Sequence, residues 1–244
     1  MPIPQVPGVM LTFFLASAVC GQVSPPAVSA VQRADGKGYD VTITNTAKSP
    51  ITALFMQGTG PQPGEQRWVS LIEKDYAFTP REQPIASGET RTLRAADEAE
   101  LKVVLFYDGT AAGDPEWVAA ARKRRELALE AVKKVIQFVD AVRAQQRSRQ
   151  EAIQELKGLE EAMIERARQQ PLGPQGPALQ GLDSFHARIV YGGAARDLAR
   201  EESPGRAPMS FEDRLLSMKR SYLSTLQQVA GMVPELRDAA KPMQ

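Results

Sequence analysis

The sequence predicts an α+β protein whose strands and helices occupy separate segments: an N-terminal immunoglobulin-like antiparallel β-sandwich followed by a C-terminal helical hairpin or bundle. Up to Thr110, apolar residues alternate with polar ones in short runs, which is typical of half-buried strands. From Pro115 onwards, apolar residues recur at steps of three and four, the spacing of amphipathic helices. A chain of 244 residues has room for the two parts that this change of periodicity indicates.

The chain divides into five predicted segments. They are a signal peptide at 1–22 with cleavage near residues 18–22, the sandwich at 23–114, a long helical hairpin or a single long helix at 115–170, a Pro/Gly linker at 171–177, and further helices at 178–244. The sandwich segment is slightly acidic and the helical part is slightly basic, which identifies no partner.

An apolar run near the N-terminus predicts export. No charged residue precedes Arg33, and residues 9–20 are apolar over a length that fits the core of a signal peptide, whereas a membrane span needs roughly 20 residues. Ala16-Ser17-Ala18 supplies the small residues that a signal peptidase recognises. The opening MPIPQVPG lacks the usual Lys or Arg, so a buried N-terminal strand is the alternative. We expect an exported, periplasmic or secreted protein without a membrane span.

Cys20, the single cysteine of the chain, raises a question about processing. A bacterial lipoprotein signal places a lipidated cysteine directly after a small residue, whereas Val19 precedes Cys20 here. Two outcomes stay open: Cys20 is removed with the signal peptide, or a lipid anchor at Cys20 attaches the protein to the envelope. The apolar neighbours of Cys20 do not activate its thiol as a nucleophile.

Five runs in the first half are predicted strands. Turn residues separate them and no helical pattern intervenes, so they indicate an antiparallel, immunoglobulin-like sandwich. Trp68 is the expected large core anchor of this half. The runs are 39–44, 51–56, 67–72, 89–94 and 101–107.

The long helical segment carries an apolar stripe that lapses once. The stripe of 132–142 is lost across 143–150 and then resumes. Ser148 and Glu151 have the spacing of a capping box, in which two side chains satisfy free amides at the start of a helix. We therefore favour two antiparallel helices joined near Gln146, with a single rod as the alternative.

Two more helices are expected towards the C-terminus. The third covers 178–201, with a break at 192–193 (Gly-Gly) as an open alternative. The fourth begins at a cap formed by Ser210 and Asp213, and Pro234 ends or kinks it.

Composition excludes several classes of function. The 30 basic and 29 acidic side chains leave a net charge of +1, without the basic excess of a general nucleic-acid-binding protein. One cysteine cannot form a disulfide framework or a multi-cysteine metal site. One histidine, His186, leaves little for imidazole catalysis or metal binding. We predict no catalytic residue, no metal site and no cofactor.

Four features invite a functional interpretation, and a structural one is favoured for each. The basic tetrad at 122–125 could bind phosphate or an anionic surface, but its residues cover every face of a helix, so we expect solvated charge. His186 has no Ser or Cys motif beside it and is expected to be a surface or packed helical residue. The loop from Asp108 to Asp114 has too few oxygen ligands for calcium and is a predicted turn. The Gly-rich segment 58–64 contains prolines where phosphate-binding amides are needed, and is a predicted hairpin loop.

Three phrases of the sequence together resemble a known group of proteins. They are VTITNTAKSPITAL at 41–54, PIASGETRTL at 84–93 and VVLFYDGTAAGD at 103–114. They are similar to phrases of exported proteins of soil bacteria of the Acidobacteria type, in which a small β-sandwich runs into long arginine-rich helices. The resemblance covers residues 28–145 and implies a bacterial envelope or secreted setting. No activity is assigned to that group, so no functional residue is transferred.

These observations favour an exported, non-enzymatic protein that serves in protein–protein interaction or in envelope structure. Its sheet faces or edges and its apolar helix stripes are expected to bind a protein partner or a second copy of the chain, the latter through the helices. Two alternatives stay open. One is a lipid-anchored envelope scaffold tethered through Cys20. The other, disfavoured because no nucleophile–base or metal-ligand set stands out, is an enzyme with a cleft site between the halves.

Overall fold

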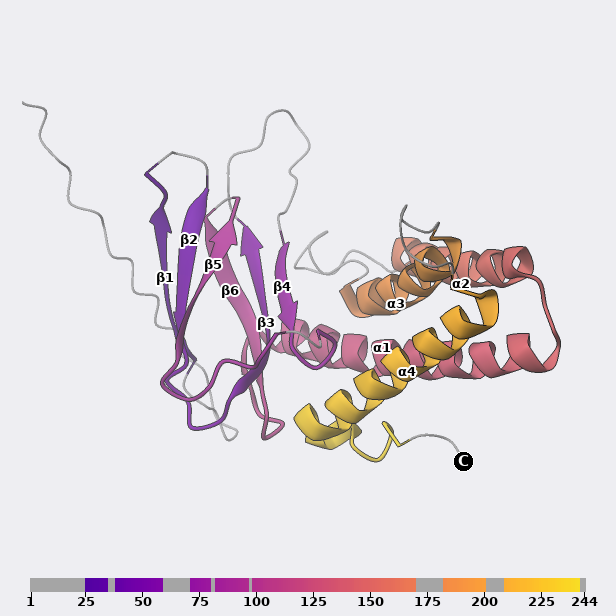
Figure 1. Cartoon of the computed structure of the whole chain (residues 1–244). Helices are drawn as coiled ribbons and strands as arrows, with labels where there is room; N and C mark the ends of the chain where they lie inside the picture. The colour runs from indigo at the N-terminus through magenta and orange to yellow at the C-terminus, as the bar shows by residue number, and fades with distance from the viewer. Residues whose placement is uncertain are drawn as a thin grey trace, which may run out of the picture.

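Among the residues that the computed structural model describes, seven strands form two antiparallel sheets and four α-helices follow them (Figure 1). The described residues are 25–34, 38–58, 71–79, 82–96, 98–169, 182–200 and 209–241. The chain is therefore of the α+β class that the sequence predicts.

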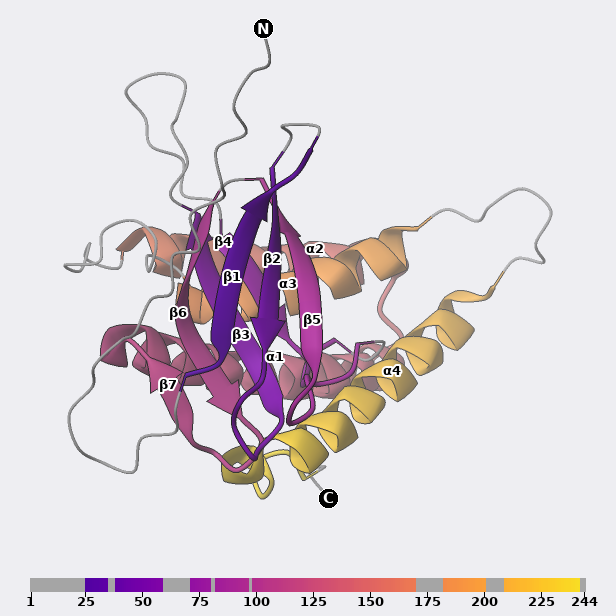
Figure 2. The same ribbon diagram turned by 90° about the vertical axis from the view of Figure 1, so that its left-hand side faces the viewer.

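The molecule has three layers, two sheets and a layer of helices. Sheet A contains β1 (Ala27–Gln32), β2 (Tyr39–Thr44) and β5 (Thr90–Ala95), in the order β1-β2-β5. Sheet B contains β4 (Leu71–Asp75), β3 (Ile51–Gly58), β6 (Ala99–Phe106) and β7 (Ala111–Gly113), in that order. The sheets share one hydrophobic core, and the helices cover the other face of sheet B (Figures 1 and 2).

Strand β3 is buried on both faces because it lies in the middle layer. Leu54 and Met56 pack towards sheet A in a cluster with Ile43. Phe55 points the other way, into a cluster with Trp117 of the first helix. A strand covered on both sides is apolar throughout instead of alternating, which accounts for the continuous hydrophobic run of β3.

Strands β1 and β7 are additions to the sequence-based prediction. β1 lies at the end of the uncharged N-terminal stretch, and β7 is a three-residue strand within the loop predicted to be a plain turn. Four of the five predicted strands occur to within two residues at either end. Of the fifth, 67–72, only the last two residues are described, and Trp68 lies outside the described residues.

The helices are α1 (Pro115–Ala144), α2 (Arg149–Gln169), α3 (Leu182–Ala199) and α4 (Phe211–Met232), and a short 3-10 helix, η2 (Pro234–Leu236), follows the last. Helix α1 begins at Asp114, whose carboxylate accepts a hydrogen bond from the backbone N–H of Glu116 at 2.8 Å. Pro234 ends α4 rather than kinking it, which is one of the two outcomes that the sequence left open.

The chain turns between α1 and α2 at Gln146, so the segment forms two helices and not one rod. Gln146 has a φ of 50°, in the left-handed region. The N–H of Gln146 donates to the carbonyl of Arg143 at 3.3 Å, and the N–H of Arg147 donates to that of Val142 at 3.1 Å. These are the two hydrogen bonds of a Schellman motif, which satisfies the last carbonyls of a helix.

Both predicted helix caps are confirmed. The N–H of Ser148 donates to the Glu151 carboxylate at 2.9 Å, and the N–H of Glu151 donates back to the Ser148 hydroxyl at 3.3 Å. The Ser210 hydroxyl accepts from the N–H of Asp213 at 3.0 Å. Local capping chemistry thus fixed the start of α2 and of α4.

Helix α3 packs extensively against both α1 and α2. One core contains Val139 of α1, Leu156 of α2 and Tyr191 of α3. Helix α3 is continuous through its two glycines. A Cβ atom at Gly192 would meet the carboxylate of Glu160 on α2, the flexible end of a side chain that can move aside.

Replacing Gln146 by glycine is expected to stabilise the protein. Glycine adopts the left-handed conformation without the steric cost that a glutamine bears there, so Gln146→Gly should raise the free energy of unfolding by about 0.5–1 kcal/mol. Urea denaturation followed by far-ultraviolet circular dichroism measures the change.

The neighbouring substitution Gln145→Gly is the matched control. Gln145 has a φ of −93°, so glycine relieves no strain there and should leave stability equal or lower. A Gln146→Gly protein that is no more stable than the Gln145→Gly protein contradicts this account of the turn.

Candidate functional site

The basic tetrad at 122–125 is where the structure departs most from the sequence-based expectation. Arg122 and Lys123 are exposed, but Arg124 and Arg125 are buried, with relative exposures of 0% and 1%. The expectation of solvated charge is therefore wrong for two of the four residues. Sheet B covers one side of α1, and α3 and α4 cover others, so residues that point in successive directions around the helix cannot all reach water.

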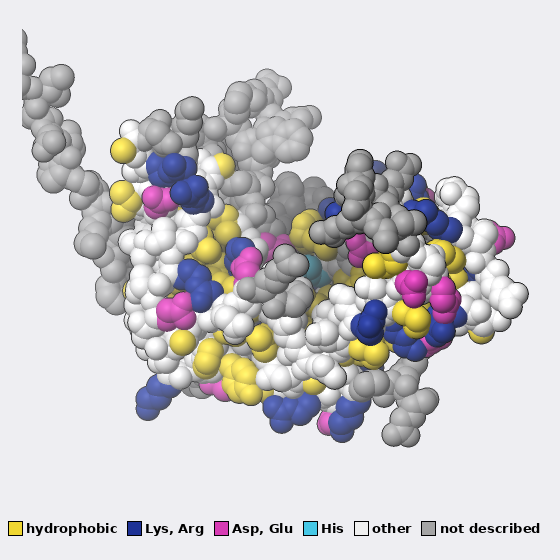
Figure 3. All heavy atoms as spheres, in the orientation of Figure 1, with side chains coloured by type: hydrophobic (Ala, Val, Ile, Leu, Met, Phe, Trp, Pro, Cys, Tyr) yellow, Lys and Arg dark blue, Asp and Glu magenta, His cyan; other side chains and the backbone are white. Residues whose placement is uncertain are grey.

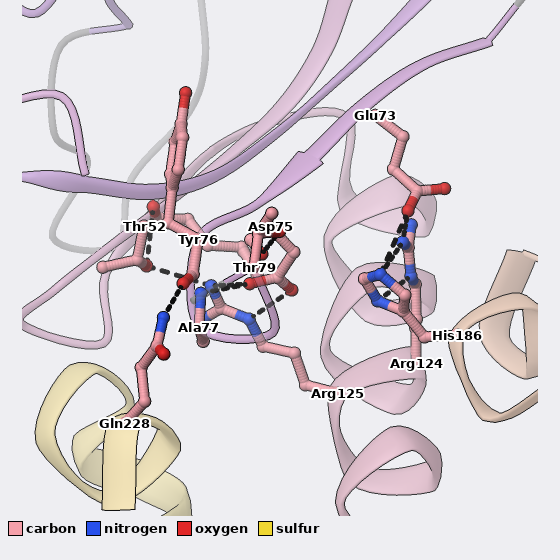
Figure 4. Close-up of polar contacts among 11 residues, drawn as sticks. Thr52, Glu73, Asp75, Tyr76, Ala77, Thr79, Arg124, Arg125, His186 and Gln228 are labelled. Atoms are coloured by element: carbon pink, nitrogen blue, oxygen red, sulfur yellow. Dashed lines mark hydrogen bonds and ion pairs between the residues drawn. The ribbon is translucent and has the colours of Figure 1, made fainter. Parts of the chain in front are cut away.

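Arg125 forms a buried, bidentate ion pair with Asp75, the last residue of β4 (Figure 4). Its Nε donates to Asp75 Oδ2 at 2.9 Å, and its Nη2 donates to Oδ1 at 3.0 Å. Nη2 also donates to Thr52 Oγ1 of β3 at 3.0 Å, and that hydroxyl donates to the carbonyl of Leu105 on β6 at 3.2 Å. This chain of bonds ties α1 to three strands of sheet B, in the geometry in which buried charges are best tolerated.

The segment that follows β4 is held by the same carboxylate and by α4. The backbone N–H of Ala77 donates to Asp75 Oδ1 at 3.2 Å, and the Thr79 hydroxyl donates to the Asp75 carbonyl at 2.7 Å. From the other side, the Gln228 amide of α4 donates to the carbonyl of Tyr76 at 2.6 Å (Figure 4). Asp75 therefore lies where β4, α1 and α4 meet.

Arg124 forms a second cluster with Glu73 of β4 and His186 of α3 (Figure 4). Arg124 and Glu73 are in direct ion-pair contact. Arg124 Nε donates to His186 Nδ1 at 2.9 Å, and Nη2 lies 3.1 Å from Nε2. His186 Nε2 lies 3.4 Å from Glu73 Oε1. The histidine is thus a packed helical residue that links α3 to α1 and sheet B.

Aromatic rings complete the surroundings of Arg124. Its guanidinium carbon lies 4.7 Å from the centre of the Phe55 ring and 5.5 Å from that of Phe185, distances at which a desolvated cation is attracted to a ring face. Its Nη1 has no hydrogen-bond partner among the described residues. Charge and stacking, more than a full set of hydrogen bonds, hold this guanidinium.

Burial lowers the pKa of His186 well below its ordinary value, and the positive charges of Arg124 and Arg125 lower it further. Glu73 acts in the opposite direction, but its carboxylate is already in contact with Arg124. A ring that accepts a proton donor at Nδ1 carries its own proton on Nε2, the side that faces Glu73. The neutral imidazole is therefore the form that fits. Burial also lowers the pKa of Arg124, but a guanidinium remains charged beside a carboxylate.

His186 is visible from outside, in a hollow between the strands and the helices (Figure 3). The hollow has a volume of about 230 Å³, and its apolar lining includes Phe78, Val132 and Ile189. The Tyr222 hydroxyl in its wall donates to a backbone carbonyl at 3.0 Å, and burial raises the pKa of Tyr222 above its ordinary value. The polar groups of this hollow serve internal contacts and present no nucleophile paired with the imidazole.

The other sequence candidates lie apart from this site. Asp108 Oδ1 accepts from the N–H of Thr110 at 3.0 Å and from its hydroxyl at 2.6 Å, which is the structure of a turn. Gly58 ends β3, while the rest of the Gly-rich segment and Cys20 lie outside the described residues. Within the described ranges, no three His, Cys, Asp or Glu side chains gather as a metal site. No helix in that part of the chain is both long and apolar enough to cross a bilayer.

Comparison with protein-family models, with curated proteins and with solved structures finds no match for this chain. Its function is therefore argued from its own residues.

Neither acidic partner of the buried arginines was predicted from the sequence. Glu73 and Asp75 come directly after the predicted strand 67–72, and the real strand continues through them. Residues two apart on a strand point to the same face, so both carboxylates face the helices. The two-residue spacing of Glu73 and Asp75 is the signal that the sequence offered. Only the fold places the two carboxylates opposite Arg124 and Arg125.

Removing one partner of the Arg125–Asp75 pair is expected to destabilise the protein severely. Asp75→Leu leaves a buried guanidinium without its counter-charge, and such changes cost about 3–5 kcal/mol. Combining it with Arg125→Met removes both charges, so the double variant should be far more stable than the sum of the two single losses implies. Chemical denaturation of the four proteins measures the coupling.

The exposed pair between Lys123 and Glu126, in the same turn of the same helix, is the matched control. Its N–O distance of 2.8 Å is as short as that of the buried pair, but both side chains are about half exposed. Lys123→Ala should therefore leave stability almost unchanged. Strictly additive losses in the buried pair would contradict the role assigned to it.

Stability should fall as the pH drops below about 6.5, the ordinary pKa of histidine. The pKa of His186 is lower in the folded protein than in the unfolded chain. At pH values between these two pKa values, the unfolded chain binds more protons than the folded protein, so acid favours unfolding in that range. One such group changes the free energy of unfolding by at most about 1.4 kcal/mol per pH unit. His186→Gln should flatten the profile between pH 7 and 5, measured by urea denaturation; an unchanged slope contradicts this.

Proposed function

We propose that the protein is an exported, non-enzymatic interaction module, in which the helices form a rigid base and sheet A faces the partner. The export part of the proposal rests on the apolar run at 9–20. The interaction part rests on how the charged and polar side chains of the chain are used, and on the order of its strands.

The strand order supports an immunoglobulin-type sandwich. Strands β1, β2 and β5 pair as strands A, B and E do in such domains, and β4, β3, β6 and β7 pair as C′, C, F and G do. All of these pairings are antiparallel, as the type requires. Domains of this architecture present strand edges, sheet faces and end loops to other proteins, which is consistent with a binding role by analogy of fold alone.

The observation that carries the proposal is that the side chains best suited to chemistry are engaged in contacts inside the molecule. Glu73, Asp75 and His186 all contact Arg124 or Arg125 inside the molecule, so the groups best suited to chemistry hold sheet B to the helices. Sheet A lies on the opposite side of the sandwich from the helices (Figure 1).

Threonine hydroxyls pair across the outer face of sheet A. Thr42 lies 3.2 Å from Thr92 between hydroxyl oxygens, and Thr44 lies 2.9 Å from Thr90. Such cross-strand pairs give a flat, ordered surface whose side chains lose little entropy on contact. A rigid, flat face backed by a fixed base suits recognition of another folded or extended chain.

Site-specific photo-crosslinking in the exporting cell tests the proposal. A photoreactive amino acid at Thr92, on the exposed face of β5, should give a discrete protein adduct. The same group at Glu161, on the exposed side of α2, is the matched control and should give none. The mass of the adduct separates a second copy of this chain from another protein. Adducts from Glu161 alone, or from neither position, contradict the assignment of sheet A as the binding face.

A further inference from the structure

One edge of sheet A is formed by β1, and its outward-facing backbone groups can be identified. The N–H of Arg33 donates to the carbonyl of Gly38 at 3.0 Å, which places a hydrogen-bonded pair at that point of the β1–β2 ladder. Hydrogen-bonded and non-bonded pairs alternate along an antiparallel ladder. The odd-numbered residues of β1 therefore bond to β2. The N–H and C=O groups of Val28, Ala30 and Gln32 point away from the sheet.

The other three edge strands carry features that discourage pairing with another chain. β5 presents Arg91 and Arg94, and β7 has only three residues. β4 is charged at three of its five positions, and α1 engages Glu73 and Asp75 among them. Charge, shortness and cover are the devices by which proteins protect sheet edges. β1 has six residues, with no charged side chain and no proline. Among the described residues no strand pairs with its outer edge.

We propose that β1 is a homodimerisation edge, which pairs antiparallel with β1 of a second copy to make one continuous six-stranded sheet. This inference rests on the proposed function, and it names a partner for the β1 edge of sheet A. An antiparallel pair related by a two-fold axis is self-complementary, because each strand presents the same donors and acceptors to the other. The uncharged side chains of β1 allow two identical strands to approach without like-charge repulsion.

The backbone pattern selects one register. With the two-fold axis at Ala30, Ala30 pairs with its own copy and Val28 pairs with Gln32 of the other copy, so all three outward residues form hydrogen bonds. Shifting the axis to Ser29 would bring Pro26 opposite Gln32, and proline has no N–H to donate. The register at Ala30 also places Ser29 opposite Val31. Val31 is 65% exposed in the single chain, and a neighbouring strand shields it.

Sedimentation velocity on the full chain tests the pairing. A six-residue strand pair is a small interface, so the dimer is expected to be weak and to grow with concentration up to ~1 mM. Ala30→Pro removes one outward N–H at an edge position that tolerates proline, and should give a monomer with an unchanged circular dichroism spectrum. Arg94→Pro is the matched control, because Arg94 presents its N–H at the opposite edge of the same sheet, and it should still dimerise.

A wild-type chain that stays monomeric throughout overturns the proposal, as does a dimer that survives Ala30→Pro. Either result leaves the proposed function standing if the crosslink at Thr92 yields a different protein. Loss of the Thr92 crosslink as well would contradict both the homodimer and the proposed function.

Cysteine pairing tests the register, in a Cys20→Ser background. Ser29 and Val31 of the other copy form a non-hydrogen-bonded pair, whose Cα atoms lie about 4.5 Å apart, within reach of a disulfide. A mixture of Ser29→Cys and Val31→Cys chains should therefore form a crosslinked dimer on mild oxidation. Neither variant should do so alone, since diagonal residues lie about 7–8 Å apart. Self-crosslinking of Ser29→Cys, or no crosslinking in the mixture, overturns the register.

Discussion

The buried ion pair between Arg125 and Asp75 is the interaction on which the arrangement of sheets and helices depends. Neither α1 nor β4 can move away from the other without leaving a charge in an apolar interior, which is far more costly than losing an apolar contact. The pair also restricts the orientation of α1 relative to β4, because a guanidinium and a carboxylate fit together in few orientations. Hydrophobic contacts between sheet B and α1 supply stabilisation, and the ion pair fixes which of many apolar packings is adopted.

Two adjacent arginines can serve two carboxylates because the helix and the strand each hold their two side chains apart at this contact. Glu73 and Asp75 project from one face of β4, about 6.7 Å apart along the strand. Arg124 and Arg125 leave α1 about 100° apart, so their heads diverge towards the two acids. His186 fills the space beside the first of them and brings α3 to the same place. One helical turn thereby orients sheet B and α3 together.

Local features of the sequence were sufficient to predict most of the secondary structure. Alternation located β2, a preceding turn located β5, and cap chemistry located the starts of α2 and α4, because each depends on neighbours in the chain. The burial of Arg124 and Arg125 depends on what packs around α1, and no residue within a few positions reveals it. The insertion of α3 between α1 and α2 was missed for the same reason. β1 was missed because its uncharged residues continue the composition of the N-terminal stretch before it.

Burial of sheet B on both faces has a consequence for how the protein is made. The face that carries Phe55 and Leu105 is complete once β6 has been synthesised, but Trp117 and Ala121, which cover it, belong to the segment that follows. Until α1 emerges from the ribosome, the nascent strands present an apolar surface, because the described residues of α1 that cover it come later in the chain. The junction at Asp114 is therefore a boundary in secondary structure and not in folding. A chain cut there loses its helices and, with them, the cover over half of its sheets.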